Sequence, residues 1–174
     1  MKRIAIIVGL CVLLLTTLNG CSKSADDLYV EGKTLILNKE TVEEGLKTLR
    51  LFEQKFPKEP RTPEVVLALA LALQGEKKFD EAVETYNRLM EKYPDSAEAY
   101  KAMFLLGYMY YEDIKDNDKT LEVFNKFITT YPDSELVLSA GVLIENIGLP
   151  VEEWSTVKKL GLAGPSPDSS KAGN

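Results

Sequence analysis

The chain has 174 residues, 45% of them hydrophobic, which is enough for one domain with a sizeable core. It carries 21 Lys and Arg against 27 Asp and Glu, and it has no histidine. An acidic surface without a basic block argues against nucleic-acid binding and against adhesion to anionic lipid by charge. Cys11 and Cys21 are the only cysteines, both near the N-terminus, so no disulfide framework stabilises the rest of the chain.

Residues 1–20 have the pattern of a secretory signal peptide. Met1-Lys2-Arg3 is a short positive region, and residues 4–18 form an uncharged apolar run that is shorter than the roughly 20 residues of a bilayer span. The run ends in Leu18-Asn19-Gly20-Cys21, which resembles the lipobox of bacterial lipoproteins. By this resemblance the signal is cleaved before Cys21, whose thiol receives a diacylglycerol and whose amine is acylated. An uncleaved anchor helix, or an ordinary signal peptide cleaved nearby, is the alternative.

The lipobox resemblance implies firm membrane attachment, because two acyl chains anchor a protein stably where one does so marginally. Residues 21–24 are then a short lipidated tether. Ser22 stands where an aspartate retains enterobacterial lipoproteins in the inner membrane, so the resemblance favours the outer membrane, with the protein facing the periplasm.

Helical periodicity and punctuation by proline and glycine predict a series of helices along the mature chain. Ser24 and Asp27 have capping-box spacing before a helix over residues 27–37, and Thr41 to Glu44 predict a capping box for a helix ending at Phe56. Thr62 is expected to cap the next helix, with Pro63 in its first turn. Further helices are expected at 80–93, 97–112 and 119–131, then one stopped by Gly148, and a short one from Pro150 to Gly161 that carries Trp154. Residues 161–174, rich in Gly, Pro and Ser, are expected to be disordered.

A short sequence recurs along the chain at a regular spacing. Tyr93-Pro94-Asp95-Ser96 recurs as Tyr131-Pro132-Asp133-Ser134, 38 positions later, and Phe56-Pro57 lies 37 positions before the first of them. A fixed period of this size is typical of a stacked repeat.

The repeats resemble the tetratricopeptide repeat (TPR), a helix–turn–helix unit with the signature W-x2-L-G-x2-Y, then A-x3-F, then P. The small residues Gly32, Ala70 and Gly107 occupy the place where the two helices of a unit touch. The resemblance implies an all-α, TPR-like α-solenoid of about three repeats, over residues 25–57, 62–95 and 97–133, with capping helices over 134–160. The matching positions are Leu28, Glu31, Gly32, Leu35, Gly45, Leu49 and Pro57 in the first copy, Val66, Leu69, Ala70, Leu73, Ala82, Tyr86 and Pro94 in the second, and Met103, Leu106, Gly107, Tyr110, Thr120, Phe124 and Pro132 in the third.

The residues offer no catalytic or metal-binding set. Without histidine or a free thiol in the mature chain, catalytic triads, Cys–His pairs and His-ligated metals are excluded. The acidic turn 112–118 invites a calcium interpretation, but an EF-hand starting at Asp113 would need Gly and Glu where Asp118 and Phe124 stand. We expect no enzyme activity, no cofactor and no metal.

By the TPR resemblance, the first helix of each unit lines a concave groove for a protein partner. The predicted groove is apolar and aromatic, which suits an extended or helical partner segment. The alternative is that the first helices pack on one another, with Leu67 and Phe104 as core. The predicted groove residues are Tyr29, Lys33, Ile36, Leu67, Leu71, Phe104, Tyr108 and Tyr111.

A lipobox followed by long-period TPRs closely resembles the TPR lipoprotein of the outer-membrane β-barrel assembly machine, which usually has about five repeats. Three repeats and a cap indicate a smaller relative or paralogue. The resemblance implies a non-catalytic scaffold that binds proteins of the cell envelope and reaches the membrane through the lipid on Cys21, with no nucleic-acid partner. A pilotin-like lipoprotein, or a chaperone that binds secreted polypeptides, is the alternative.

Overall fold

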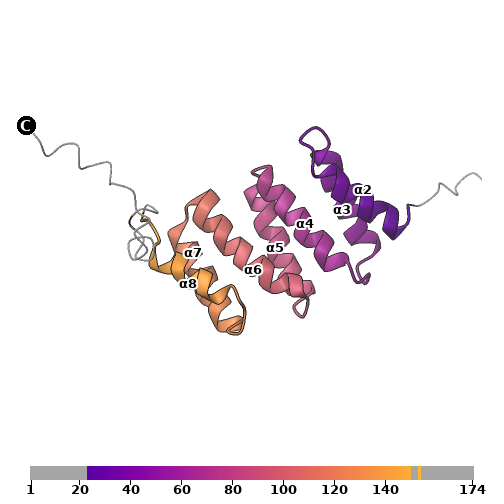
Figure 1. The fold of residues 1–174 in the computed structure, drawn as a ribbon. Coiled ribbons are helices and arrows are strands. Elements are labelled where there is room, and N and C mark those ends of the chain that lie inside the picture. The colour runs from indigo at the N-terminus through magenta and orange to yellow at the C-terminus, as the bar shows by residue number, and fades with distance from the viewer. Residues whose placement is uncertain (1–22, 150–152, 154–174) are drawn as a thin grey trace, which may run out of the picture. The chain divides into compact units, whose positions relative to one another are not determined.

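The computed structural model describes residues 23–149 and 153, and every regular element in this part of the chain is helical (Figure 1). The predicted signal peptide, Cys21 and Ser22, the tail 161–174 and Trp154 lie outside the described residues. In the described part, no helix is both long and apolar enough to span a bilayer. The chain divides into two compact units, residues 1–57 and 58–174, and each is described by itself.

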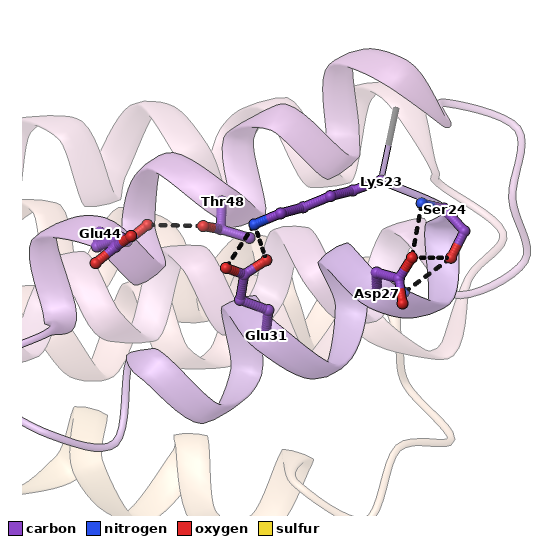
Figure 2. Close-up of polar contacts among 6 residues, drawn as sticks. All are labelled: Lys23, Ser24, Asp27, Glu31, Glu44 and Thr48. Atoms are coloured by element: carbon purple, nitrogen blue, oxygen red, sulfur yellow. Dashed lines mark hydrogen bonds and ion pairs between the residues drawn. The ribbon is translucent and has the colours of Figure 1, made fainter. Parts of the chain in front are cut away.

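Unit 1 contains the helix pair α2 (Ala25–Leu35) and α3 (Val42–Lys55). The predicted capping box at the start of α2 is confirmed (Figure 2). The Ser24 hydroxyl accepts from the Asp27 amide at 3.1 Å, and the Asp27 carboxylate accepts from the Ser24 amide at 3.0 Å and from its hydroxyl at 2.7 Å. Just before the cap, Lys23 Nζ lies 2.6 Å from both carboxylate oxygens of Glu31, so the start of the described chain is tied to α2 at two points.

The capping box predicted at Thr41 is wrong. The Thr41 backbone, with φ −115° and ψ −3°, is already close to helical geometry, so its hydroxyl does not reach the first free amides of α3. The hydroxyl donates instead to the carbonyl of Leu35 at 2.8 Å, which satisfies the end of the preceding helix. Within α3, the Thr48 hydroxyl donates to the carbonyl of Glu44, one turn earlier, at 2.9 Å, as threonine hydroxyls inside helices often do (Figure 2).

The helices α2 and α3 pack closely together at two glycines. A Cβ on Gly32 would lie 2.5 Å from Cδ2 of Leu49, and a Cβ on Gly45 would lie 2.7 Å from Cγ2 of Ile36. Gly32 therefore lets the Leu49 side chain of α3 lie directly on the backbone of α2, and Gly45 lets Ile36, the C-cap residue of α2, lie on the backbone of α3. Leu28, Leu46, Leu49 and Phe52 fill the space between the two helices.

Unit 2 contains α4 (Thr62–Gly75), α5 (Phe79–Lys92), α6 (Ala97–Met109), the π-helical turn η2 (Tyr110–Ile114), α7 (Asn117–Thr130) and α8 (Val137–Glu145). Each helix packs against the next along the chain, and α4 also contacts α6 (Figure 1). This is the arrangement of a TPR-like helical repeat, in which first helices neighbour first helices.

The start of α4 differs from the prediction in one respect. Pro63 lies in its first turn as expected, but Thr62 is the first helical residue rather than the cap, and its side chain is fully buried. Arg61 occupies the capping position without a side-chain hydrogen bond to the helix.

Three turns of unit 2 each contain one residue with positive φ. These residues are Lys77 (φ 57°) after α4, Lys115 (φ 62°) after η2 and Gly148 (φ 76°) after α8. At Lys77 and Lys115 the left-handed conformation reverses the chain, and the next helix, α5 or α7, begins two residues later.

One hydrophobic cluster holds α6, α7 and α8 together. Phe124 and Phe127 of α7 are fully buried, and a Cβ on Gly107 of α6 would lie 2.7 Å from the Phe124 ring. Ala140 and Leu143 bring α8 into the same cluster. The glycine at the TPR small-residue position thus admits an aromatic ring of the partner helix.

Candidate functional site

In unit 2, the helices α4, α6 and α8 carry far fewer charged residues than α5 and α7. We refer to α4, α6 and α8 as the first helices, and to α5 and α7 as the second helices. Glu64 is the one charged residue of α4, Glu98 and Lys101 are those of α6, and Glu145 is that of α8. A helix that is apolar nearly all round is either buried or covers something apolar. The second helices are amphipathic by contrast, and the charged residues of α5 are Asp80, Glu81, Glu84, Arg88, Glu91 and Lys92.

Three large apolar side chains on these first helices are exposed. Leu71 of α4 keeps 43% of its surface accessible, Tyr108 of α6 keeps 40%, and Leu138 of α8 keeps 78%. We call the surface that they mark, together with the two pockets described next, the α4–α6–α8 face.

Two pockets meet at Tyr108. The pocket between α6 and α8 has a volume of about 410 Å³, and none of its lining residues is charged. The pocket between α4 and α6 has a volume of about 400 Å³ and is more polar at its end. The first is lined by Phe104, Tyr108, Leu138, Ser139, Val142 and Leu143, and the second by Leu71, Gln74, Gly75, Lys77, Leu105, Tyr108 and Asp113.

A chain of hydrogen bonds closes the polar end of the α4–α6 pocket. The Tyr86 hydroxyl of α5 donates to Gln74 Oε1 at 2.8 Å, and Gln74 Nε2 donates to Asp113 Oδ2 at 2.6 Å. Burial raises the pKa of Tyr86, and the nearby Asp113 carboxylate raises it further. The tyrosine is therefore a neutral, fixed donor that holds the Gln74 amide in one orientation.

The aromatic end of α6 continues into η2. The rings of Tyr108 and Tyr111 lie 6.3 Å apart between centroids, and Lys115 Nζ lies 5.7 Å from the centre of the Tyr111 ring. Burial also raises the pKa of Tyr111, which is half-buried. Tyr108 is thus the exposed member of this pair, and it has a ring neighbour that limits its movement.

The predicted groove residues of unit 2 divide into two kinds. Leu71 and Tyr108 are exposed, whereas Leu67, Phe104 and Tyr111 are half-buried. Phe104 packs on Phe124 and Phe127 of α7, at 5.5 and 5.7 Å between ring centroids, and also lines the α6–α8 pocket. Phe104 therefore belongs both to the core and to the wall of a pocket.

The three predicted groove residues of unit 1 are half-buried. Lys33 Nζ lies 3.4 Å from the Tyr29 hydroxyl and 5.2 Å from the centre of its ring, and Tyr29 packs on Phe52 at 6.3 Å. Ile36 lies against Gly45 within the helix pair. That these residues continue one groove with those of unit 2 stays a prediction.

The contribution of α8 to this face was not predicted from the sequence, where the helix is expected only as a cap. Leu138 and Val142 of α8 form one wall of the α6–α8 pocket. The period of the repeats gave no signal for it, because Gly141 lies 34 positions after Gly107, whereas Gly107 lies 37 positions after Ala70.

The acidic turn at 112–118 serves the local structure. Asp113 accepts from Gln74, and Asp116 Oδ1 accepts from the Lys119 amide at 2.9 Å as the cap of α7. Lys115 Nζ lies 3.3 Å from the Glu112 carboxylate. Among residues 23–149 and 153, no group of three or more acidic residues is placed to hold a metal ion.

A comparison with known protein families assigns the chain to one of them. The model of the family YfiO, described as outer membrane lipoprotein, matches residues 22–147, which is well over half of the chain. The match begins at the residue after Cys21 and ends beyond α8, so it spans both units. No curated protein matches the chain closely enough to count as a relative. The chain, with its paired helices and the apolar α4–α6–α8 face, belongs to the YfiO family of outer membrane lipoproteins.

Proposed function

We propose that the protein is a lipid-anchored, non-catalytic scaffold in the periplasm that takes part in outer-membrane protein assembly, and that its α4–α6–α8 face binds a segment of a protein partner. The observation that carries the proposal is the row of exposed Leu71, Tyr108 and Leu138 on three first helices that bear almost no charge. Membership of the YfiO family supports the envelope location.

The chemistry of the face selects the kind of partner. Exposed apolar side chains that flank pockets are typical of protein–protein contact sites. The α6–α8 pocket offers apolar walls for a partner side chain, and the α4–α6 pocket offers Lys77 and Asp113 at its polar end. A partner segment with apolar side chains spaced to enter both pockets would bury Tyr108 between them.

The lipid on Cys21 would hold the N-terminal helix α2 near the membrane. α2 begins at Ala25, four residues after Cys21, and four extended residues reach roughly 13–14 Å. Replacing Cys21 with Ala should leave the signal uncleaved or release the protein from the membrane fraction. Normal cleavage together with unchanged membrane retention would contradict the anchor.

The scaffold can be tested by photo-crosslinking in the native cell envelope. A photoreactive residue replaces Tyr108, and a matched control variant carries it at Asn125, which is exposed on α7 away from the lining of both pockets. One dominant protein adduct from position 108, identified by mass spectrometry and absent from position 125, is the expected result.

Two other outcomes contradict the scaffold. Many secreted or outer-membrane polypeptides captured at position 108 would favour a chaperone that binds unfolded chains weakly. Adducts of equal strength from positions 108 and 125 would show that the α4–α6–α8 face is not selective.

A further inference from the structure

The second and third copies of the repeat differ by one residue in the length of their turn region. The small residue of the first helix, Ala70 in α4 and Gly107 in α6, precedes a lysine with positive φ in both copies. The interval is seven positions to Lys77 and eight positions to Lys115. From either lysine, the second helix begins two residues later. The third copy therefore has one extra residue between Gly107 and Lys115.

Backbone hydrogen bonds place this extra residue in the π-helical turn η2. After α4, the Lys78 amide donates to the carbonyl of Leu73, five residues earlier, at 2.9 Å. At the equivalent place after η2, the Asp116 amide donates to the carbonyl of Tyr110, six residues earlier, at 3.0 Å. The Lys115 amide also donates to the Tyr110 carbonyl, which is a π-helical bond. The wider winding of η2 thus takes up the extra residue.

The repeat fold does not require a π-helical turn at this place. In unit 1, Gly32 and Gly45 are also one position further apart than the equivalent Ala70 and Ala82. There the first helix α2 is α-helical throughout, and the irregular turn after it takes up the residue. π-Helical turns are rare and are frequent at functional sites, so a departure that the fold does not need points to function.

The side chain that η2 brings to the α4–α6 pocket is Asp113. It is exposed, lines the pocket, and accepts from Gln74 through Oδ2 at 2.6 Å. Lys77 lines the same pocket and is also exposed. Within residues 23–149 and 153, Asp113 Oδ1 accepts no hydrogen bond and Lys77 Nζ pairs with no carboxylate. The pocket end therefore offers one free acceptor and one free donor.

We propose that η2 carries its extra residue for partner binding, by bringing Asp113 to the pocket end, where Oδ1 accepts from a main-chain N–H of the partner segment. This inference rests on the proposed function of the α4–α6–α8 face. Lys77 then donates to a main-chain carbonyl of the same segment. An extended segment has such groups free, whereas the backbone groups inside a helix are already paired. The partner therefore lies extended across the pocket end.

A basic side chain of the partner is the weaker occupant of this place. It would meet the Asp113 carboxylate, but Lys77 lines the same pocket and would repel it. A neutral main-chain amide has no such penalty, and its neighbouring carbonyl suits the lysine. The pair of opposite charges thus fits a peptide backbone better than it fits a single charged group.

Deletion of Glu112 tests the role of η2, because it gives the third copy the length of the second. With the photoreactive residue at Tyr108, we expect the partner adduct in the native envelope to fall severalfold and Tm to change by only a few degrees. Glu112→Ala is the matched control. It removes the same exposed side chain and its ion pair with Lys115, but keeps the number of residues, so the adduct should stay at full yield.

Asp113→Asn tests the hydrogen bond without changing the length of η2. The asparagine oxygen can still accept from Gln74, whereas its amide group presents donors where the partner needs an acceptor. We expect a severalfold smaller adduct and little change in Tm. Crosslinking of the unaltered face in isolated envelopes at low and high salt tests the charge of the partner group. A main-chain amide should keep its yield at high salt, and a basic side chain should lose it.

Three results would overturn the inference and leave the scaffold standing. Full adduct yield from either variant would remove Asp113 from the binding site. Loss of the adduct at high salt would assign the place to a charged partner group. Unfolding on deletion of Glu112 would show that the extra residue serves the fold. In each case the unaltered protein still gives its adduct from position 108, and absence of that adduct would overturn the proposed function and this inference together.

Discussion

Gln74 Nε2 donates a hydrogen bond of 2.6 Å to Asp113 Oδ2 across 39 positions of sequence. The carbonyl oxygen of the same Gln74 side chain accepts from the buried Tyr86 hydroxyl at 2.8 Å. A single amide thus joins α4, α5 and η2 at one end of the α4–α6 pocket. Because the donor and the acceptor of this amide are both used, its orientation is set by its two partners.

Gln74→Leu should lower the free energy of unfolding of unit 2 by about 1–3 kcal/mol, because the buried Tyr86 hydroxyl loses its acceptor. Urea unfolding at neutral pH measures the change. Gln54→Leu, at an exposed position of α3, is the matched control and should change stability by less than about 0.5 kcal/mol. Adding Tyr86→Phe to Gln74→Leu should recover part of the loss, and a simple sum of the two single effects would contradict the pairing.

Stability should fall at alkaline pH. Burial raises the pKa of Tyr86 in the folded protein, so above about pH 10 the unfolded chain loses a proton that the folded chain keeps. The free energy of unfolding then falls as pH rises, by at most about 1.4 kcal/mol per pH unit for one group. Tyr110 and Tyr111, whose pKa values burial also raises, add to the slope. Urea unfolding between pH 8 and 11 should show a shallower fall in Tyr86→Phe, and equal slopes would contradict the assignment.

Gly107→Ala should destabilise the α6–α7 pair by about 1–3 kcal/mol, because the added Cβ would lie 2.7 Å from the ring of the fully buried Phe124. Thermal unfolding followed by circular dichroism measures it. Gly75→Ala is the control. No described atom lies within 4 Å of its Cβ position, so this substitution should be neutral or should stabilise α4 by up to about 1 kcal/mol. Similar effects at the two glycines would argue against close packing at Gly107.

Leu138→Ser should separate binding from stability. Leu138 is 78% exposed, so its loss should change the free energy of unfolding by less than about 0.5 kcal/mol. It should nevertheless reduce the partner adduct from position 108 severalfold, because Leu138 forms a wall of the α6–α8 pocket. Leu37→Ser, at a site that is 84% exposed in unit 1, is the control and should keep the adduct at full yield. An undiminished adduct in Leu138→Ser would remove α8 from the binding face.

The cap of α2 gives a prediction at acid pH. The Ser24 hydroxyl, followed by the Ser24 amide, lowers the pKa of the Asp27 carboxyl below its ordinary value. The contribution of this carboxylate to stability is therefore present above about pH 4, and is lost as pH falls through the lowered pKa. In NMR titrations, Ser24→Ala should raise the Asp27 pKa toward that of an unfolded aspartate. Ser24→Thr keeps the hydroxyl and should hold the pKa low, and identical titrations in both variants would contradict the capping box.

The helices of the repeats could be predicted to within three residues because their signals are local. Apolar periodicity indicated their buried faces, and the prolines at 57, 94 and 132 indicated the breaks between repeats. The cap at Ser24 was predicted correctly, whereas those at Thr41 and Thr62 were wrong. Capping depends on the backbone angles of the candidate residue as well as on its side chain, and these angles are set by the preceding turn.

The candidate site was harder to predict than the fold. Tyr108 is exposed and lies in α6, whereas Tyr111 is half-buried and lies in the π-helical turn η2, whose wider winding departs from the α-helical period. Periodicity cannot reveal such a change. The exposure of Leu138 was not predicted, because an apolar helix near the end of a repeat array resembles a cap that is covered by its neighbours.

The cap and ion pair at the start of α2 limit how far an anchored molecule can move. Lys23 is held by Glu31, and Ser24 by Asp27, so only Ser22 would be free to extend between a lipidated Cys21 and the helix. An exposed ion pair contributes about 0–1 kcal/mol, so Lys23 would yield first under tension, and the capped serine after it. With so short a tether, a protein lipidated at Cys21 would keep the start of α2 close to the bilayer surface.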